Sequence, residues 1–305
     1  MTPPRTQRAA RNSTIQVMIG AALISFSPVL VRVADVGPTM AGFYRCLFGG
    51  LTLAVIVVIR GEAVITRRRP LFLALAASVL FAADLSLWHR AIGSVGPGLA
   101  TILANFEVFF LAAFGILVLK ESVDWRFLVS VPLAVAGLFL VVGLDWNQLE
   151  PDCRWGVYVG LLGAIAYSGY MIVLRKSQHL RPPISTVSHL MIVSFGVAAI
   201  MGTEGYLQGE TFRIPDAASG IAMLAYGVLC QALAWVLISR GLGGMDASRA
   251  GLLLLLQPTL AFIWDIVLFA RPTGMTDALG AVLALGAIYL GTTTRAAHSE
   301  ERGGK

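Results

Sequence analysis

Charged residues are scarce in this sequence, and their scarcity decides the class of protein. Only 13% of the 305 residues are Asp, Glu, Lys or Arg, whereas 57% are apolar and the mean hydropathy is +0.77. Soluble domains carry about 25% charged residues. A soluble fold of this length would lack the polar side chains to cover its surface. The composition therefore predicts an integral membrane protein whose main solvent is the lipid bilayer.

Cysteine and histidine are also rare, with three and four residues respectively. Cys46, Cys153 and Cys230 are widely separated, so they form neither a disulfide framework nor a metal-ligand spacing. The chain has no Gly-x-Ser-x-Gly motif, no paired intramembrane aspartates in a common motif and no metal-binding histidine pair. We therefore expect no metal, no cofactor and no enzymatic activity. A membrane scaffold stays an alternative, although it would not need polar residues at the midplane.

The basic residues lie in short clusters between long apolar runs. The isoelectric point near 9.5 could suggest nucleic-acid binding, but this distribution is typical of topology signals, and we expect no nucleic-acid partner. Each apolar run is long enough to cross about 30 Å of hydrocarbon as a helix. We expect ten transmembrane helices, at residues 15–34, 39–59, 71–92, 98–119, 127–144, 155–174, 184–202, 217–239, 247–270 and 278–294.

An even number of spans places both termini on one side of the membrane. With cytoplasmic termini, seventeen of the twenty-three Lys and Arg residues face the cytoplasm and five lie at the outer side, with Arg45 inside a span. This bias predicts cytoplasmic tails at residues 1–14 and 295–305. The basic N-terminus leads into its apolar run without a cleavage site, so we expect an uncleaved first span. The location expected is a bacterial inner membrane.

The two halves of the chain resemble each other. A shift of 150 residues lays "LWHRAIGSVGPGLATIL" at 87–103 over "LISRGLGGMDASRAGLL" at 237–253, and it places Glu107 on Gln257. The expected repeats are residues 15–146 and 155–294. Each holds five spans, an odd number, so the second repeat must be inverted relative to the first. Inverted repeats around a central cavity are typical of secondary transporters.

Three stretches resemble the drug/metabolite transporter superfamily and its EamA-type branch. They are "GPTMAGFYRCLFGGLTL" at 37–53, "AIGSVGPGLATILANFEVFFLAAFGILVLKES" at 91–122 and "GLGGMDASRAGLLLLLQPTLAFIWDIVLF" at 241–269. Within the branch the chain is most similar to the YddG-type aromatic amino-acid exporters. The resemblance implies a ten-helix inverted-repeat fold, with a cavity formed by the first four helices of each half. The acid at Glu121 has no counterpart in the second half, where "FARPTG" stands, so paired terminal acids are not expected to gate symmetrically.

Ionisable side chains within the spans are candidates for the site, because each costs at least about 2.5 kcal/mol at mid-membrane without a partner or water. Arg45 and Asp84 lie at similar depth, roughly 9 and 12 Å below the outer boundary. We expect them to form a structural ion pair. The alternative is that Asp84, on one helical face with Trp88, lines the cavity and meets a substrate ammonium or a proton.

Glu107 and its repeat counterpart Gln257 both fall near the midplane, where a pseudo-symmetric site belongs. A helix–helix hydrogen bond is the alternative role for Glu107. Asn105 is almost opposite Glu107 around an ideal helix, so only one of them is expected to face the cavity.

Aromatic and amide side chains could form the walls of a flat-sided pocket. The candidates are Tyr44, Trp88, Tyr167, Tyr170, Gln231 and Trp235. Enrichment of Trp and Tyr at membrane interfaces is the competing explanation. His89 and Arg90 are expected to reach the headgroups at the outer edge, and Pro28 is expected to kink its helix and serve as a hinge.

The predicted function is export or facilitated transport of amino acids, aromatic and other large neutral ones, by alternating access. The alternative is a broader drug or metabolite efflux transporter. The expected partners are a small-molecule substrate and the bilayer. The chain is expected to act as a monomer or a weak homodimer, the latter through small-residue faces on the fifth and tenth spans.

Overall fold

A computed structural model describes residues 5–64, 67–117, 125–142, 150–178, 180, 185–242, 253–254 and 256–303. The regular elements in these ranges are helices. They are α1 (Arg5–Ser25), α2 (Ser27–Val33), α3 (Pro38–Arg60), α4 (Arg68–Ala104), α5 (Glu107–Leu117), α6 (Trp125–Val142), α7 (Pro151–Gln178), α8 (Thr186–Leu207), α9 (Ala217–Ala225), the π-helix η2 (Tyr226–Leu233), α10 (Ala234–Leu242), α12 (Leu256–Phe269) and α13 (Met275–Gly303). The sequence segments with Lys120 and Glu121, and with "GGMD" at 243–246, lie outside the described residues.

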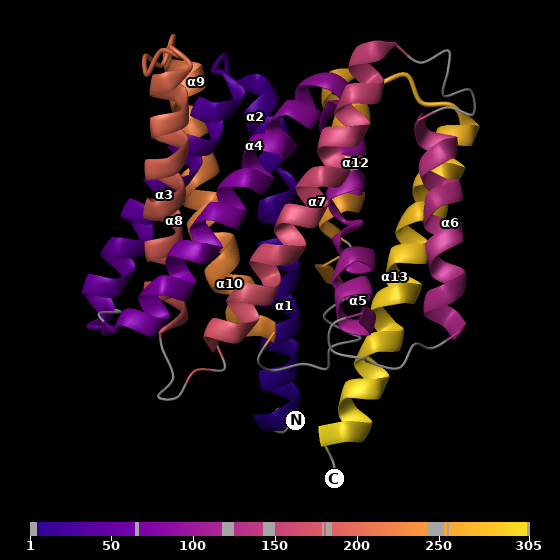
Figure 1. The fold of residues 1–305 in the computed structure, drawn as a ribbon, viewed down its shortest axis with the longest axis horizontal. Coiled ribbons are helices and arrows are strands. Elements are labelled where there is room, and N and C mark those ends of the chain that lie inside the picture. Colours follow the sequence, from indigo (N-terminus) through magenta and orange to yellow (C-terminus); the bar gives the residue numbers. More distant parts are fainter. Residues whose placement is uncertain are drawn as a thin grey trace.

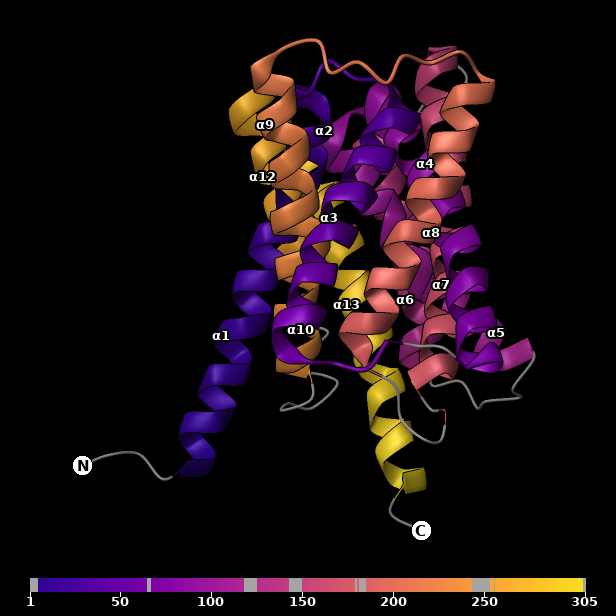
Figure 2. The same ribbon diagram turned by 90° about the vertical axis from the view of Figure 1, so that its left-hand side faces the viewer.

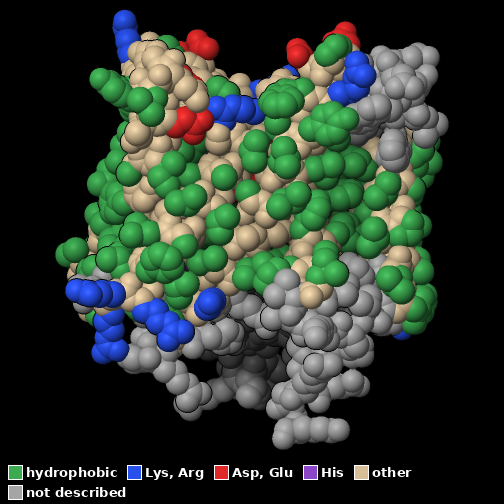
Figure 3. All heavy atoms as spheres, viewed as in Figure 1, with side chains coloured by type: hydrophobic (Ala, Val, Ile, Leu, Met, Phe, Trp, Pro, Cys, Tyr) green, Lys and Arg blue, Asp and Glu red, His purple; other side chains and the backbone are tan. Residues whose placement is uncertain are grey.

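The helices stand side by side as a bundle, and its two ends differ. The start of α1 and the end of α13 project from the same end of the bundle, which we call the terminus end (Figures 1 and 2). Hydrophobic side chains cover the middle of the face in Figure 3, whereas charged side chains gather at the rims. Six segments of the described chain are long and apolar enough to cross a bilayer. They are Asn12–Val33, Pro38–Arg60, Arg68–Leu111, Pro151–Leu174, Thr186–Leu207 and Ala217–Gly241. Shorter apolar helices follow at Leu128–Leu138, Leu256–Phe269 and Met275–Leu290.

Gly96 divides α4 into two parts. Its backbone angles, φ 82° and ψ 165°, lie in a region essentially open to glycine alone, and Pro97 follows it. An unbroken helix of 37 residues would be about 55 Å long, well beyond the hydrocarbon thickness. The turn predicted at residues 93–98 is therefore compressed into one residue, with helix on both sides.

Three further interruptions occur in the helices nearest the centre. α1 ends at Ser25 and α2 begins at Ser27, with Pro28 in its first turn, where the missing N–H of proline is tolerated. α4 ends at Ala104 and α5 begins at Glu107. The eighth predicted span is α-helical at both ends but π-helical at η2. Transporter sites are commonly built where spanning helices are interrupted.

The helices α6 and α13 pack closely on each other. Gly137 and Gly280 face each other so tightly that a Cβ on Gly137 would lie 2.7 Å from the carbonyl oxygen of Gly280. Small residues permit such close approach of two membrane helices. The small-residue faces of the fifth and tenth predicted spans therefore join these two helices within one chain.

Candidate substrate cavity

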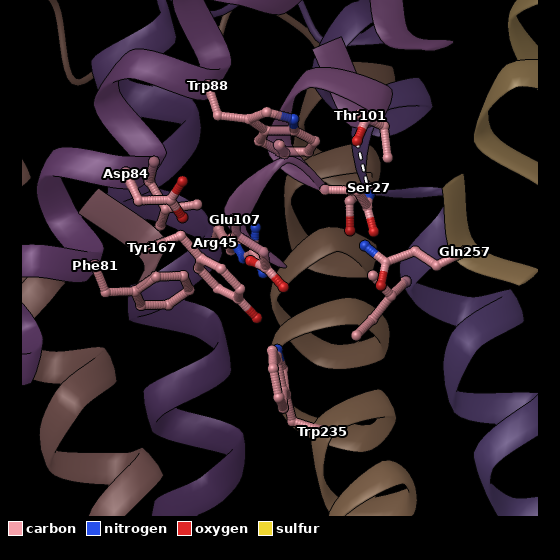
Figure 4. Close-up of a pocket in the computed structure, with 14 residues that line it drawn as sticks. Ser27, Arg45, Phe81, Asp84, Trp88, Thr101, Glu107, Tyr167, Trp235 and Gln257 are labelled. Atoms are coloured by element: carbon pink, nitrogen blue, oxygen red, sulfur yellow. Dashed lines mark hydrogen bonds between the residues drawn. The ribbon is translucent and has the colours of Figure 1, made fainter. Parts of the chain in front are cut away.

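A cavity of about 100 Å³ lies inside the bundle, and residues from both halves of the chain line it. The lining residues are Ile24, Ser27, Arg45, Phe81, Asp84, Leu85, Trp88, Thr101, Ala104, Asn105, Glu107, Tyr167, Trp235 and Gln257. Figure 4 shows Trp88 and Trp235 at opposite ends, with Asp84 and Gln257 on opposite sides. The helix interruptions cluster here, because Ser27, Asn105 and Trp235 adjoin the breaks described above.

The structure places the predicted site residues in two groups. Asp84, Trp88, Glu107, Tyr167, Trp235 and Gln257 line the cavity, whereas Tyr44, Tyr170 and Gln231 lie outside its lining. Tyr170 is buried behind the wall, where its ring stacks on Phe81 at 4.7 Å between centroids. The Tyr44 hydroxyl donates to the carbonyl oxygen of Phe212, so this side chain ties α3 to the segment before α9.

Arg45 has partners that the sequence did not predict. Its Nε donates to Oε1 of Gln231 at 2.7 Å and its Nη1 donates to the Tyr226 hydroxyl at 2.8 Å. In place of the expected ion pair with Asp84, the guanidinium is held by these neutral groups and by the ring of Tyr226, 4.8 Å away. Within the described residues, no carboxylate oxygen lies within 4 Å of the Arg45 guanidinium. Arg45 and Asp84 instead share the cavity wall.

The π-helix explains how two side chains five positions apart reach one guanidinium. Bonding from residue i to i+5 places Tyr226 and Gln231 one above the other, where an α-helix would turn them apart. Close packing holds η2 against α3, because a Cβ on Gly227 would lie 2.8 Å from the backbone nitrogen of Gly49. Gln231 also donates from Nε2 to Ser194 Oγ at 3.1 Å, which fixes the orientation of its amide.

His89 does not reach the headgroups as predicted, and Arg90 is held by an acid. His89 is 1% exposed, and its Nε2 lies 2.9 Å from the Tyr226 hydroxyl that accepts from Arg45. Arg90 pairs with Glu204 of α8, with 2.9 Å between Nη2 and Oε1. Because α4 continues as a helix to the break at Gly96, His89 lies inside the bundle, whereas Arg90 is partly exposed and meets the last turn of α8.

Asn105 and Glu107 both line the cavity, which contradicts the prediction that only one of them faces it. The prediction assumed an unbroken helix. The break at Asn105 and Phe106 changes the rotation between the two residues, and Nδ2 of Asn105 donates back to the carbonyl oxygen of Thr101 at 2.8 Å. Glu107 becomes the first residue of α5.

Two polar atoms in the cavity wall have no protein partner. Ser27 Oγ and Trp88 Nε1 are buried without a hydrogen-bond partner in the described part of the chain. A buried unsatisfied donor costs about 1–3 kcal/mol, so such groups indicate a place where water or a ligand completes the hydrogen bonds. Trp88 is among the residues predicted from the sequence, whereas Ser27 and Thr101 are not. The signal available for Ser27 was its position next to Pro28.

A buried carboxyl joins several helices near the end of the bundle opposite the termini. Asp265 of α12 is 1% exposed, and its Oδ2 accepts from the backbone nitrogen of Gly98 at 3.0 Å. Nη1 of Arg271 lies 3.2 Å from the same oxygen, and Nη1 of Arg32 lies 3.9 Å from Oδ1. This cluster joins α2, α4 and α12. Its member Gly98 lies one helical turn before Thr101, which lines the cavity.

Comparison with known proteins agrees with a transporter fold. The sequence profile of the EamA-like transporter family matches residues 12–143 and 154–293, so the chain belongs to this family. One solved crystal structure superposes with a TM-score of 0.68 at 16% identity, over 94% of this chain and 98% of that chain, which shows a shared fold.

Two curated relatives are similar to this chain over most of its length. The uncharacterized transporter YwfM of Bacillus subtilis is 25% identical over 262 residues, which cover 85% of this chain and 86% of the relative. The pseudopaline exporter CntI of Pseudomonas aeruginosa is 24% identical over 284 residues, which cover 90% and 94%. These relatives support transport in general. They do not support the predicted similarity to YddG-type aromatic amino-acid exporters.

Proposed function

We propose that the protein exports amino acids with aromatic or other large neutral side chains across a bacterial inner membrane, by alternating access between its two halves. The observation that carries this proposal is the composition of the cavity wall. A guanidinium, two carboxyl groups and several aromatic rings line one small space. These are the groups that would bind the carboxylate, the ammonium and the side chain of an amino acid.

Arg45 is the proposed partner of the substrate carboxylate. Its Nε and Nη1 already hold Gln231 and Tyr226, so the guanidinium is fixed in position while its charge has no carboxylate within 4 Å in the described chain. A buried cation of this kind favours an incoming anion strongly, because a charge in the membrane interior is costly without a counter-ion.

Asp84 and Glu107 are the proposed partners of the substrate ammonium. Figure 4 shows Asp84 across the cavity from Gln257, with Glu107 and Arg45 drawn between them. The rings of Phe81, Tyr167 and Trp235 supply flat apolar faces for a side chain. A guanidinium, two carboxyl groups and flat apolar rings in one cavity together match a zwitterion with an apolar side chain.

The cavity must widen to hold such a substrate. Its volume of about 100 Å³ is below the roughly 300–1,000 Å³ of ordinary ligand pockets. The Asp265 cluster ties α2, α4 and α12 together at the end away from the termini, so we propose that the cavity widens toward the terminus end. The interruption at Phe26 and Pro28 is the proposed hinge for that movement.

The orientation is proposed from the distribution of charge. In the predicted topology seventeen of the twenty-three Lys and Arg residues lie on the side of the termini, among them Arg67, Arg68 and Arg69, which are exposed. Such an excess of basic residues favours the cytoplasmic side, so we propose that both termini are cytoplasmic. A monomer is the proposed unit, because the small-residue contact between α6 and α13 is made within one chain.

A broader metabolite exporter is the second candidate. It is favoured by the similarity to CntI, which is named a pseudopaline exporter. The two candidates share the cavity and differ in the substrate that it admits.

Flux into liposomes containing the purified protein tests the proposal. The panel is labelled phenylalanine, tryptophan, leucine, glutamate and lysine. Saturable flux of the aromatic and large neutral members, above that of glutamate and lysine, is the expected result. Absence of flux for all five amino acids would overturn amino-acid export and favour the second candidate.

Analogues of phenylalanine test the assignment of the binding groups. Phenethylamine lacks the carboxylate and 3-phenylpropionate lacks the ammonium. Each analogue is added as a competitor of labelled phenylalanine flux. Arg45→Gln is expected to weaken inhibition by 3-phenylpropionate and to leave inhibition by phenethylamine largely intact. Asp84→Asn is expected to show the reverse pattern. Equal effects of each variant on both analogues would contradict the assignment.

A further inference from the structure

A second concave site lies on the outside of the bundle, near the terminus end. It is a groove of about 300 Å³ and does not share a lining residue with the cavity. We call it the arginine groove, and its lining residues are Leu23, Ile56, Ile59, Arg60, Leu233, Val236, Leu237 and Arg240.

Helical spacing explains why these residues share one surface. Ile56, Ile59 and Arg60 of α3 are three and four positions apart, so they lie on one face. Leu233, Leu237 and Arg240 follow the same rule along η2 and α10. The π-helix η2 packs against both α1 and α3, and together with α10 it supplies Leu233, Val236, Leu237 and Arg240 to the groove between them.

The groove is apolar along its length and basic at one end. Arg60 is the last residue of α3, and Arg240 lies in the last turn of α10. The Arg60 guanidinium is 3.5 Å from Glu62 Oε1, in an exposed ion pair of the kind that contributes little. Two guanidinium groups at the end of an apolar groove offer planar donors suited to a phosphate.

We infer that the arginine groove binds an anionic phospholipid, with the phosphate at Arg60 and Arg240 and an acyl chain along the apolar walls. The neighbouring surface faces the bilayer, since the exposed fraction of Val58 is 79% and that of Ile59 is 78%. A free phosphate would gain nothing from the apolar walls. In the proposed orientation the groove faces the cytoplasmic leaflet, where anionic lipids are enriched.

The groove also adjoins the helices that form the cavity. Leu23 lines the groove, and the next residue, Ile24, lines the cavity. In the same way, Trp235 lines the cavity and the next residue, Val236, lines the groove. A lipid in the groove therefore contacts the outer side of α1 and α10 where their inner side meets the substrate. Transport is expected to depend on anionic lipid for this reason.

Lipid binding to the purified full-length protein tests the inference independently of any substrate. The probes are phosphatidylglycerol and phosphatidylcholine with identical acyl chains, measured by native mass spectrometry. Wild type is expected to prefer phosphatidylglycerol. The double variant Arg60→Gln with Arg240→Gln is expected to bind it roughly 30-fold more weakly, about fivefold for each arginine near the membrane surface.

Matched variants separate the groove from general charge. Arg68→Gln with Arg69→Gln removes the same charge from exposed positions at the start of α4 and should keep wild-type affinity. Leu237→Trp fills the groove without changing charge and should also weaken binding, with the melting temperature serving as a check on folding. Equal loss in both double variants, equal binding of the two lipids, or competition by inorganic phosphate alone would overturn the inference. The inference would also be overturned if Leu237→Trp abolished self-association of the protein without weakening lipid binding. That result would assign the groove to a second copy of this chain.

Discussion

The carboxyl of Asp265 accepts a hydrogen bond from the backbone nitrogen of Gly98, at 3.0 Å, across the contact between α12 and α4. Gly98 has this N–H available because the helix restarts after the break at Gly96. The carboxyl thus serves as a cap that comes from the other half of the chain, and it also pairs with Arg271.

Asp265→Asn should therefore destabilise the protein. The amide keeps an oxygen acceptor for Gly98 but loses the charge that pairs with Arg271, and hydrogen bonds to charged groups contribute about 1.5–3 kcal/mol. A lower melting temperature in detergent is the expected result. Asp277→Asn is the control, because Asp277 caps Gly274 in the same way at an exposed position. Equal stability of the two variants would contradict a specific role for the buried cap.

Gly227→Ala should disturb the Arg45 site through packing alone. The new Cβ would lie 2.8 Å from the Gly49 nitrogen and 2.9 Å from the Arg45 carbonyl oxygen, both backbone atoms that cannot move aside alone. Overpacking of this kind costs about 1–3 kcal/mol. We expect a lower melting temperature and slower transport. Gly93→Ala, with no atom within 4 Å of its Cβ, should be neutral or slightly stabilising.

Coupling to protons can be tested on the two cavity acids. Asp84 and Glu107 are the carboxyl groups that line the cavity in the described part of the chain. If a proton moves with the substrate, neutralising Asp84 and Glu107 together should abolish the response of flux to a pH gradient. Each single variant should retain part of it. A full response in Asp84→Asn with Glu107→Gln would exclude both groups as proton carriers.

Pro28→Ala tests the hinge. Replacing the proline permits a helical hydrogen bond across the interruption at Phe26, which should straighten α1 and α2. Transport is expected to slow several-fold while the melting temperature stays equal or rises. Pro132→Ala is the matched control, because Pro132 lies inside α6, away from the cavity lining. Similar transport losses in both variants would show that proline content, and not the hinge, limits the rate.

The partners of Arg45 differ from those predicted from the sequence. The sequence correctly marked it as a buried charge that needed partners, and depth along the helix suggested Asp84. Depth is only one coordinate, because the direction of a side chain depends on rotation about the helix axis. The π-helix brought Tyr226 and Gln231 to the guanidinium, and nothing in local sequence periodicity predicted a π-helix there.

Asn105 and His89 show the same limitation. The prediction that Asn105 points away from Glu107 was correct for an ideal helix and wrong for this one, which is broken between them. His89 was predicted at a helix end because a glycine-rich turn follows it. The structure continues the helix to Gly96 and buries His89 against Tyr226. Both errors come from assuming where a helix stops.

The sequence by itself determined that the chain is embedded in a bilayer and approximately where its helices lie. It also determined which ionisable side chains need partners inside the membrane. Those properties are local, since hydropathy and charge belong to each residue and act over a span of about twenty residues. Tertiary structure alone decided which polar groups meet, because that depends on helix breaks and on contacts between residues far apart in the chain. The bond between Asp265 and Gly98, and the bonds of Arg45 to Gln231 and Tyr226, join segments separated by 167 to 186 positions. Only the packed bundle brings such segments within hydrogen-bonding distance.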